Sequence, residues 1–448
     1  MAKLFGTDGV RGAANSVLTP ELALALGKAA GHVLAAQSPR PRVLIGRDTR
    51  ASGEMLEAAL AAGICSAGAD AVTAGVATTP AIATLTRLQG FSAGAVISAS
   101  HNPARENGIK FLGADGAKLP DATEAAIEEL VKALRAGGRT DLAAESVGRY
   151  YEDEGSSETY AFAARASVAA DVSGFRLVVD AANGAGYRLN GDILESMGVR
   201  ITRIHCGPDG LNINKACGST HPDSMCETVV SAGADLGAAF DGDGDRVILS
   251  DEKGGIVDGD RVMAICAHNW RDTDELPGNM VVGTVMSNLG LEKCLGAIGV
   301  ELLRAGVGDR YVAQLMRESG AAVGGEKSGH MIFLRHATTG DGLITLLQIM
   351  GIMASTGKRL SELAAVMEEY PQILIGVRVR RKEGWDAHSD VLAAMAAAES
   401  ALSGRGRLLV RPSGTENIIR IMAEGPDGGE LDRLANDIAE AVRRHAED

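Results

Sequence analysis

A serine with basic neighbours is the first feature of the chain that could carry chemistry. Residues 95–110 read A-V-I-S-A-S-H-N-P-A-R-E-N-G-I-K, in which an apolar run precedes Ser100 and His101, and Lys110 follows. A serine hydroxyl needs a base or a suitable electrostatic environment to act as a nucleophile, and His101 and Lys110 can supply it. The alternative is a capped turn, because Ser, Asn and Pro are turn formers. The G-x-S-x-G motif of many hydrolases is absent, which disfavours acyl transfer.

Three alternating aspartates form a second candidate site. Residues 241–246 read D-G-D-G-D-R, and carboxylates at alternate positions of an extended segment point to one side. Like charges at such spacing repel unless a cation lies between them, and hard oxygen ligands favour Mg²⁺ or Ca²⁺. An EF-hand is disfavoured because Arg246 stands at the sixth loop position, which requires glycine. An aspartyl-phosphate site with Asp241 as nucleophile and a solvated acidic turn remain as alternatives.

A glycine-rich loop, residues 324–330, reads G-G-E-K-S-G-H. In an extended loop, Glu326 and Ser328 can face one ligand and exchange hydrogen bonds with neighbouring hydroxyl groups, such as those of a sugar. His330 is a candidate for proton transfer. A tight turn without any ligand is the alternative.

A fourth stretch near the C-terminus has the composition of a phosphate site. Arginine, two hydroxyl groups and exposed glycine N–H groups form a typical phosphate cradle, and the alternative is a β-turn between two strands. The residues that would bind the phosphate are Arg411, Ser413, Gly414, Thr415 and Arg420.

Other motifs predict no site. Five residues of metal-binding type lie close together in the sequence, but their spacing matches no zinc pattern with paired cysteines, so we expect packing and loop roles for them. They are His205, Cys206, Cys217, His221 and Cys226. Residues 184–189 lack the third glycine of a dinucleotide fingerprint, and no P-loop motif occurs.

Composition excludes several classes of protein. The 448 residues are 46% hydrophobic and 3% aromatic, and the formal net charge is −14. This charge argues against broad binding to nucleic acid or to anionic membranes. No apolar run is long enough for a membrane span, and the N-terminus lacks the apolar core of a signal peptide. Six cysteines in so long a chain do not indicate a disulfide framework. We therefore expect a reducing, cytoplasmic location.

Strand and helix signals alternate along most of the chain, which predicts α/β units. We expect a linker near residues 145–155, a helix over 184–197, a buried helix over 341–354 and, after Pro371, a different unit with a helix over 385–402. The predicted fold is three similar α/β/α domains with mixed sheets and a smaller C-terminal α+β domain, around a central active-site cleft. The expected domains are 1–150, 151–252, 253–368 and 369–448.

The four candidate loops are distributed one to a domain, each after a predicted strand. Ligands bind at the carboxyl ends of strands in such sheets. A hydroxyl nucleophile, a cation loop, a hydroxyl clamp and a phosphate cradle together indicate phosphoryl transfer on a phosphosugar that is held at both ends.

The motifs S-A-S-H-N-P, D-G-D-G-D-R, G-E-K-S-G-H and R-P-S-G-T-E, in this order, resemble those of the α-D-phosphohexomutase superfamily over essentially the full chain. Within it, residues 5–12, 208–214, 217–221 and 307–312 resemble members that act on glucosamine phosphates. Members that act on mannose and glucose phosphates are the alternative. A phosphosugar- or calcium-binding protein without activity is the alternative outside enzymes.

The resemblance implies a mechanism. Ser100 carries a phosphoryl group as phosphoserine, with Mg²⁺ between it and Asp241, Asp243 and Asp245. The enzyme interconverts glucosamine 6-phosphate and glucosamine 1-phosphate through a 1,6-bisphosphate, and a hexose or glucosamine 1,6-bisphosphate acts as activator. The product would supply UDP-N-acetylglucosamine for cell-envelope synthesis. The partner is a small phosphosugar, with neither nucleic acid nor membrane, and the resemblance is compatible with a homodimer.

The resemblance also implies roles for the remaining residues. Arg11, His101 and Lys110 would support transfer at the serine, with Lys110 as an acid or base, and His330 would be a second proton-transfer group. The residues that would bind the substrate are Arg246, Glu326, Ser328, Arg411, Ser413, Gly414, Thr415 and Arg420. Lys327 and Asn417 depart from the residues common in relatives, which leaves the fine sugar specificity open.

Overall fold

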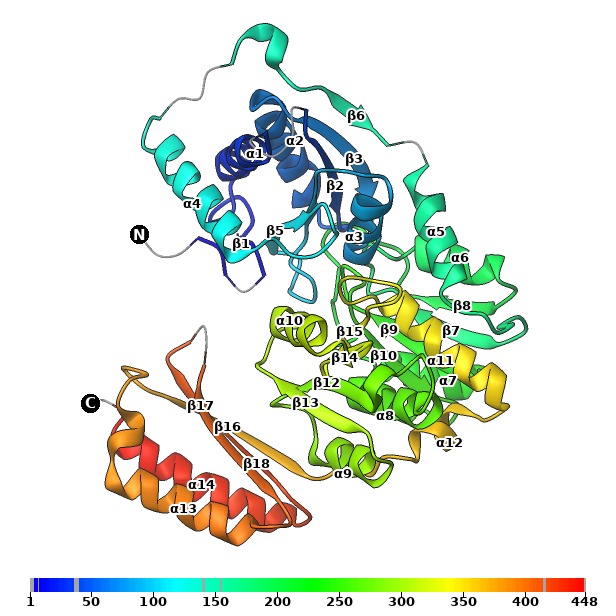
Figure 1. Ribbon diagram of the computed structural model, residues 1–448, viewed down its shortest axis with the longest axis vertical. Helices are drawn as coiled ribbons and strands as arrows, with labels where there is room; N and C mark the ends of the chain where they lie inside the picture. Colours follow the sequence, from blue (N-terminus) through cyan, green and yellow to red (C-terminus); the bar gives the residue numbers. More distant parts are fainter. Residues whose placement is uncertain are drawn as a thin grey trace. The chain divides into compact units, whose positions relative to one another are not determined.

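The computed structural model describes residues 4–6, 8–35, 40–138, 142–153, 155–413 and 416–446 (Figure 1). The chain divides into two compact units. One comprises Met1–Met286 and Val300–Val366, and the other comprises Ser287–Gly299 and Met367–Asp448. Each is described by itself. No helix among the described residues is both long and apolar enough to cross a membrane.

The first sheet of the larger unit has six strands in the order β1-β5-β4-β2-β3-β6. Its strands are β1 (Val10–Ala13), β2 (Arg42–Arg47), β3 (Asp70–Val76), β4 (Ala93–Ile97), β5 (Glu106–Gly113) and β6 (Tyr150–Glu152). The accompanying helices are α1 (Pro20–Ala35), α2 (Ser52–Ser66), α3 (Thr79–Leu88), α4 (Asp121–Arg135) and the 3₁₀ turn η1 (Ala144–Ser146). Strand β5 alone runs antiparallel to its neighbours β1 and β4, and the other pairs are parallel, so the sheet is mixed, as predicted.

Aliphatic side chains make up most of the core between the first sheet and its helices, as the low aromatic content requires. Helices α1 and α2 pack closely because Gly27 and Gly63 face each other's helix backbone, where a Cβ on either would collide with a main-chain carbonyl. Helix α3 packs on β2 in the same way, since a Cβ on Gly46 would meet the Ile82 side chain. Helices α2 and α3 thus pack on the sheet whose strand β4 leads to Ser100.

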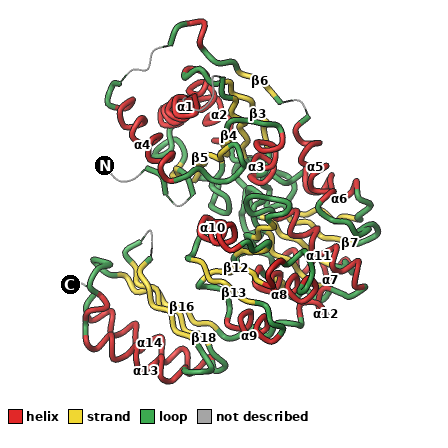
Figure 2. The backbone as a smooth tube through the Cα atoms, in the orientation of Figure 1, coloured by secondary structure: helices red, strands yellow, loops and turns green. Residues whose placement is uncertain are grey.

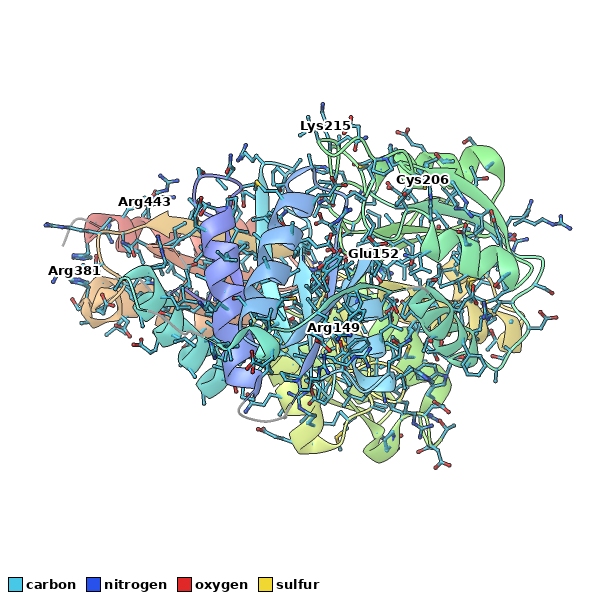
Figure 3. The ribbon with its side chains drawn as sticks, turned by 90° about the horizontal axis from the view of Figure 1, so that it is seen from above. Arg149, Glu152, Cys206, Lys215, Arg381 and Arg443 are labelled. Atoms are coloured by element: carbon cyan, nitrogen blue, oxygen red, sulfur yellow. The ribbon has the colours of Figure 1, made fainter. Side chains whose placement is uncertain are left out.

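The linker expected over residues 145–155 is wrong in part, because residues 150–152 form β6. This strand pairs with β3 in parallel, and Ala71 is the partner of Tyr150. The Arg149 N–H donates to Asp70 Oδ1 at 2.8 Å, and the Ala71 N–H donates to the Arg149 carbonyl. Arg149, labelled in Figure 3, precedes the strand, and Glu152, also labelled, is its last residue. Three exposed residues are too few to show alternation, so the sequence signal was that of a polar loop.

The second sheet has the order β11-β10-β9-β7-β8. Its elements are β7 (Arg176–Asp180), β8 (Arg200–Ile204), β9 (Leu236–Phe240), β10 (Val247–Asp251), β11 (Ile256–Val257), α5 (Ser156–Ala166), α6 (Leu189–Ser196) and α7 (Asp223–Ala232). The helix predicted over 184–197 begins only at Leu189. Gly184 lies against Gly242, where a Cβ would collide with the Gly242 carbonyl oxygen, so this segment turns instead of coiling.

The third sheet has the order β13-β12-β14-β15. Its elements are β12 (Met280–Thr284), β13 (Glu301–Ala305), β14 (Val323–Gly325), β15 (Met331–Phe333), α8 (Gly259–Trp270), α10 (Asp309–Ser319), α11 (Gly342–Thr356), α12 (Leu360–Ala364) and η2 (Pro277–Asn279). The prediction of a buried helix over 341–354 is confirmed by α11, in which eleven of the fifteen residues are buried.

The smaller unit contains an antiparallel sheet of order β16-β18-β17. Its elements are β16 (Gln372–Arg378), β17 (Arg407–Pro412), β18 (Ile418–Glu424), α9 (Leu289–Ala297), α13 (Ser389–Leu402), α14 (Gly428–Arg444) and η3 (Trp385–Ala387). Figure 2 shows α13 and α14 along this sheet. Mostly aliphatic side chains from these helices and from the strands form the core. The helix expected over 385–402 is interrupted at His388, whose extended backbone separates η3 from α13.

Candidate active site

Ser100 lies in a tight turn directly after β4 and is 2% exposed. Its backbone has a φ of 51°, in the left-handed region that non-glycine residues seldom occupy. The Ser100 N–H donates to Ser98 Oγ at 2.9 Å, and the Asn102 N–H donates to the Ala99 carbonyl at 3.0 Å. The turn therefore fixes the direction of the Ser100 side chain.

The three aspartates of the D-G-D-G-D loop connect β9 and β10 and converge on that side chain. Ser100 Oγ donates to Asp241 Oδ2 at 2.5 Å. One carboxylate oxygen from each of Asp241, Asp243 and Asp245 lies within 4.8 Å of the other two, and all three residues are buried. The predicted convergence of serine and carboxylates is thus present in the structure.

The carboxylate loop has the chemistry of a divalent-cation site. The Oδ1 atoms of Asp243 and Asp245 are buried and have no hydrogen-bond partner among the described residues. Burial, and then the neighbouring carboxylates, raise the pKa of Asp241 well above its ordinary value, and burial and Asp243 raise that of Asp245. A cation placed among these hard oxygen atoms would relieve both the repulsion and the unsatisfied lone pairs, so the residues fit Mg²⁺.

Lys110 projects from β5 into the same loop. Its Nζ donates to Asp243 Oδ2 at 2.9 Å and lies 3.6 Å from Asp245 Oδ2. Burial alone would lower the pKa of Lys110, but the surrounding carboxylates, Asp243 foremost, outweigh it and raise the pKa above its ordinary value. Lys110 is therefore a cation that can donate a proton or offset phosphoryl charge.

His101 lies beside the Ser100 hydroxyl, and Arg246 lies beside His101. His101 Nδ1 lies 3.3 Å from Ser100 Oγ and 2.9 Å from Arg246 Nη1. A guanidinium only donates, so Nδ1 accepts and carries no proton in this contact. Burial, and then Arg246 and Arg11, lower the pKa of His101 to about 4. His101 is thus neutral, and Arg11, which pairs with Asp8 on the same side, adds to the positive potential.

The third loop connects β14 and β15 as a tight turn and brings Glu326 and His330 to the edge of the cation site. Glu326 Oε1 accepts from the Gly308 N–H at 3.0 Å, and Ser328 is exposed. His330 is buried, its Nε2 lies 4.0 Å from Asp245 Oδ2, and neither ring nitrogen has a hydrogen-bond partner among the described residues. A cavity of about 320 Å³ opens beside His330. This arrangement leaves the imidazole available to a ligand.

The fourth loop belongs to the smaller unit. Arg411 on β17 and Arg420 on β18 are partners across the sheet, and burial and then Arg420 lower the pKa of Arg411. Ser413 is buried and its N–H donates to the Ile418 carbonyl at 2.8 Å. Two guanidinium groups side by side favour an anion between them. Gly414 and Thr415, predicted for the same phosphate, lie outside the described residues.

The chain matches four family models in the order of the four loops. They are the phosphoglucomutase/phosphomannomutase alpha/beta/alpha domains I (residues 2–137), II (158–255) and III (258–370), and the C-terminal domain (374–441). The chain belongs to the phosphoglucomutase/phosphomannomutase family. The resemblance predicted from the motifs is thereby confirmed, and so are the three α/β/α domains with a different C-terminal domain.

Curated relatives of this family member are similar over their whole length. The phosphoglucosamine mutase of Heliobacterium modesticaldum is 50% identical over 99% of this chain and 100% of its own, and that of Moorella thermoacetica is 52% identical over 97% and 98%. Among solved structures, a family protein from Burkholderia thailandensis has a TM-score of 0.82 at 24% identity, over 99% of this chain and 97% of its own. Aspergillus fumigatus N-acetylphosphoglucosamine mutase, with GlcNAc-6P and magnesium, has a TM-score of 0.68 at 19% identity, over 99% and 96%.

Several residues that surround the site in this phosphohexomutase fold were not predicted as site residues. Lys118 Nζ lies 2.8 Å from Asp8 Oδ1 and 2.9 Å from Asp309 Oδ1, and Asp309 Oδ2 lies 3.9 Å from His330 Nε2. Thr79 Oγ1 donates to Asp243 Oδ2 at 2.6 Å. Asp8 and Asp309 fall within the motifs F-G-T-D-G-V-R-G and V-G-D-R-Y-V that carry the resemblance, which was the only sequence signal for them.

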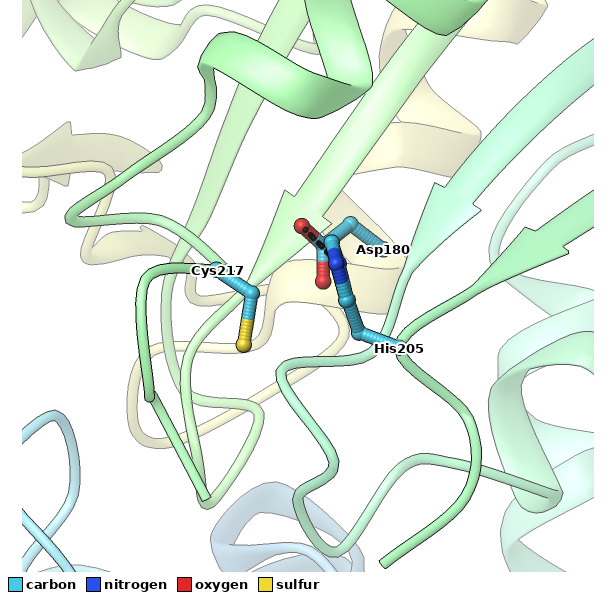
Figure 4. A group of neighbouring side chains, drawn as sticks. All are labelled: Asp180, His205 and Cys217. Atoms are coloured by element: carbon cyan, nitrogen blue, oxygen red, sulfur yellow. Dashed lines mark ion pairs between the residues drawn. The ribbon is translucent and has the colours of Figure 1, made fainter. Parts of the chain in front are cut away.

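Asp180, His205 and Cys217 form a second cluster of metal-binding types in domain II (Figure 4). Asp180 Oδ2 lies 3.0 Å from His205 Nδ1 and accepts from the Gly218 N–H at 2.9 Å. Burial, and then Asp180, raise the pKa of Cys217 to about 12, which keeps the thiol protonated. These contacts close the loop between β8 and α7 on the end of β7. The three side chains are close enough together to hold a metal ion, so the packing and loop roles expected from the sequence stay a prediction.

Proposed function

We propose that this chain is a phosphoglucosamine mutase that interconverts glucosamine 6-phosphate and glucosamine 1-phosphate. The observation that carries the proposal is the contact of Ser100 Oγ with Asp241 Oδ2 at 2.5 Å inside a buried carboxylate loop. Relatives 50% identical over the whole chain bear that name. A serine held against a cation site can carry a phosphoryl group between substrates.

In the proposed mechanism, Asp241, Asp243, Asp245 and the phosphorylated Ser100 hold Mg²⁺. The fungal relative solved with magnesium supports this choice of ion. When bound, the ion supplies positive charge that neutralises the phosphoryl oxygens. The protein's own part is to bring the three carboxylates together and to exclude water from them. All three aspartates are buried.

Charged groups of domains I and II hold the transferring phosphoryl group in this proposal. Arg246, fixed against His101 Nδ1, and Arg11 direct positive charge at the serine. Lys110, which remains protonated among the carboxylates, stabilises the negative charge of the transition state or donates a proton to the departing serine oxygen. His330, with both ring nitrogens unpaired among the described residues, transfers the proton of the sugar hydroxyl.

The substrate must be held in two orientations, because a single serine serves both ends of the sugar. We assign the sugar hydroxyls to Glu326 and Ser328. The distal phosphate is assigned to Arg411, Ser413, Gly414, Thr415 and Arg420. The bisphosphate formed in the first transfer turns round, and its other phosphate returns to Ser100. A glucosamine or hexose 1,6-bisphosphate would prime the serine.

The test of the sugar assignment compares kcat/KM for glucosamine 6-phosphate, glucose 1-phosphate and mannose 1-phosphate, each with Mg²⁺ and a priming bisphosphate. We expect glucosamine 6-phosphate to be preferred. Equal or higher values on the neutral sugars would assign the chain to the phosphomannomutase/phosphoglucomutase activity instead.

The test of the nucleophile is the intact mass of the protein. A fraction of the wild-type chains should carry one added phosphate on Ser100, and Ser100→Ala should remove both the phosphate and the activity. A fully active Ser100→Ala variant, or phosphate on Asp241 alone, would contradict the serine mechanism. The homodimer and the cytoplasmic location belong to the same proposal, and light scattering of the purified protein measures the former.

A further inference from the structure

The main chain of Ser100 is held on both sides by side chains that the mechanism does not use. Its N–H donates to Ser98 Oγ, and its carbonyl oxygen accepts from Arg50 Nη2 at 3.2 Å and from Asn214 Nδ2 at 2.9 Å. A left-handed backbone at a non-glycine residue persists only where its surroundings impose it. These hydrogen bonds are therefore what keeps Ser100 in its conformation.

The same two side chains, Arg50 and Asn214, also donate to the carbonyl of Asn102. Asn214 Nδ2 donates to the Asn102 carbonyl at 3.1 Å, and Arg50 Nη2 donates to it as well. The two carbonyls on either side of His101 thus converge on one guanidinium and one amide. Arg50 belongs to the domain of the serine and is fully buried against Asp48, whereas Asn214 reaches across from domain II.

The position of Asn214 is set by the end of β7. Its N–H donates to the Ala182 carbonyl at 2.9 Å, and its own φ is 55°. The loop that carries it starts at His205 and ends at Gly218, both of which contact Asp180. Cys206 and Lys215, labelled in Figure 3, lie on this loop. The loop that places Asn214 beside the serine is therefore anchored on the end of β7, and not on the carboxylate loop.

Asn214 nevertheless lies close to Gly242 of the carboxylate loop. A Cβ built on Gly242 would lie 2.6 Å from the Ser100 carbonyl oxygen and 2.9 Å from Asn214 Nδ2. The amide and the serine carbonyl thus lie so close to Gly242 that a side chain at this position of the carboxylate loop would collide with both. A shift of the amide would change the distance between Ser100 Oγ and Asp241.

We propose that Asn214 is a positioning residue for phosphoryl transfer. Its amide fixes the carbonyls of Ser100 and Asn102, and so keeps Ser100 Oγ directed at the cation site while the serine is loaded and unloaded. The inference rests on the proposed phosphoserine mechanism. Asn214 acts through the serine and makes no contact assigned to the sugar, so its loss should lower kcat and leave KM unchanged.

The test is Asn214→Gly, because glycine adopts the left-handed conformation without strain and the only loss is the amide. We expect kcat to fall about 10- to 100-fold, the effect of misplacing a reacting group by a fraction of an ångström to one ångström. KM for the sugar phosphate should stay at the wild-type value, whereas Tm should fall modestly because two hydrogen bonds to main-chain carbonyls are lost. Asn214→Asp, which puts a negative charge beside two carbonyl oxygens, should lose more.

The matched control is Asn212→Gly in the same loop. The Asn212 side chain bonds only within the loop, to the Gly207 carbonyl and the Asp209 N–H among the contacts of the described residues. This variant should keep the wild-type kcat. Rates are divided by the folded fraction measured by circular dichroism at the assay temperature, so partial unfolding does not imitate the effect.

Two results would overturn the inference: a wild-type kcat in Asn214→Gly, or an equal loss in Asn212→Gly, which would reduce the effect to general loosening of the loop. Failure of the proposed function is distinguished by the wild-type protein. If it takes up no phosphate from glucose 1,6-bisphosphate and converts no sugar phosphate, the mutase assignment fails before the variants are compared.

Discussion

At the residue scale, the site depends on a balance between buried carboxylates and the cations beside them. Lys110 is the only described amine that bonds to the aspartate loop, where it contacts Asp243 and Asp245. Lys110 and Mg²⁺ would therefore compete for the same oxygens. The single charge of Lys110 and the two charges of Mg²⁺ are together needed to neutralise three ionised aspartates.

Replacement of Lys110 by methionine tests this competition. We expect kcat to fall by about 10²- to 10⁴-fold, the usual contribution of a positioned acid or base. The Mg²⁺ concentration for half-maximal activity should fall as well, because the carboxylates lose a competing cation. Lys253→Met, at an exposed lysine in a turn, is the control. A variant that needs more Mg²⁺ than the wild type would contradict the competition.

The paired arginines of the smaller unit give a second prediction at this scale. Arg411→Gln should raise KM for glucosamine 6-phosphate about 10- to 100-fold, since hydrogen bonds to charged groups contribute about 1.5–3 kcal/mol. Tm should not fall, because the substitution also removes the repulsion from Arg420 across the sheet. Arg405→Gln, at an arginine paired with Glu430, serves as the control. An unchanged KM would remove Arg411 from the phosphate site.

At the element scale, helix α11 is joined to helix α5 through one buried carboxyl group. Asp341 accepts from the Ile344 N–H at the start of α11 and from the Tyr160 hydroxyl of α5. Burial raises the pKa of Asp341 to about 6. The folded protein thus holds a proton that the unfolded chain releases, and its stability falls as the pH rises through this range.

Asp341→Asn removes the titrating carboxyl group. The amide oxygen can still accept from the Ile344 N–H at the start of α11 and from the Tyr160 hydroxyl. Between about pH 4 and pH 7 the wild type should lose about 2–3 kcal/mol that the variant keeps, from a shift of about two pKa units at 1.36 kcal/mol each. Urea unfolding at the two pH values measures the difference. Parallel pH dependence of the two proteins would show that the carboxyl is ionised in the fold throughout.

The elements also show where sequence patterns suffice. Ser100 and Asp241 were predicted because each follows a short apolar run typical of a buried strand and has chemically suitable neighbours. The strand β6 was missed because its pairing with β3 is long-range. The Arg149 N–H donates to Asp70 Oδ1, a contact between residues 79 apart that no local side-chain pattern records. The predicted helix over 184–197 failed because the contact of Gly184 with Gly242 is a long-range one.

At the scale of the whole molecule, the cation site draws on several segments that are far apart in the sequence. Ser100 and Lys110 come from the first sheet, the aspartates from the second and His330 from the third. Motifs predict that such loops share a ligand, but they do not predict the residues that join the sheets. Asn214 and Lys118 were missed for that reason, since no local pattern indicates that the Asn214 amide reaches Ser100 or that Lys118 reaches Asp309. Arg50 bonds to Ser100 within its own domain and was missed because nothing in its sequence context marks it as buried.

Binding of Mg²⁺ should therefore stabilise the larger unit as a whole. At about 100 times its Kd, the ion should add about 2.7 kcal/mol to the free energy of unfolding, because it binds the folded site alone. EDTA should lower Tm by the corresponding amount, as followed by calorimetry. The shift should be smaller in Asp245→Asn, which lacks one ligand, and an equal shift in that variant would place the ion elsewhere.

The left-handed backbone of Ser100 has a practical consequence for trapping the catalytic cycle. Alanine at this position keeps a Cβ in a conformation that disfavours it, so Ser100→Ala removes the hydroxyl and also strains the turn. Glycine adopts a φ of 51° freely. Ser100→Gly should therefore be the better-behaved inactive form, with a Tm above that of Ser100→Ala, and the form in which a sugar bisphosphate can be crystallised without being consumed.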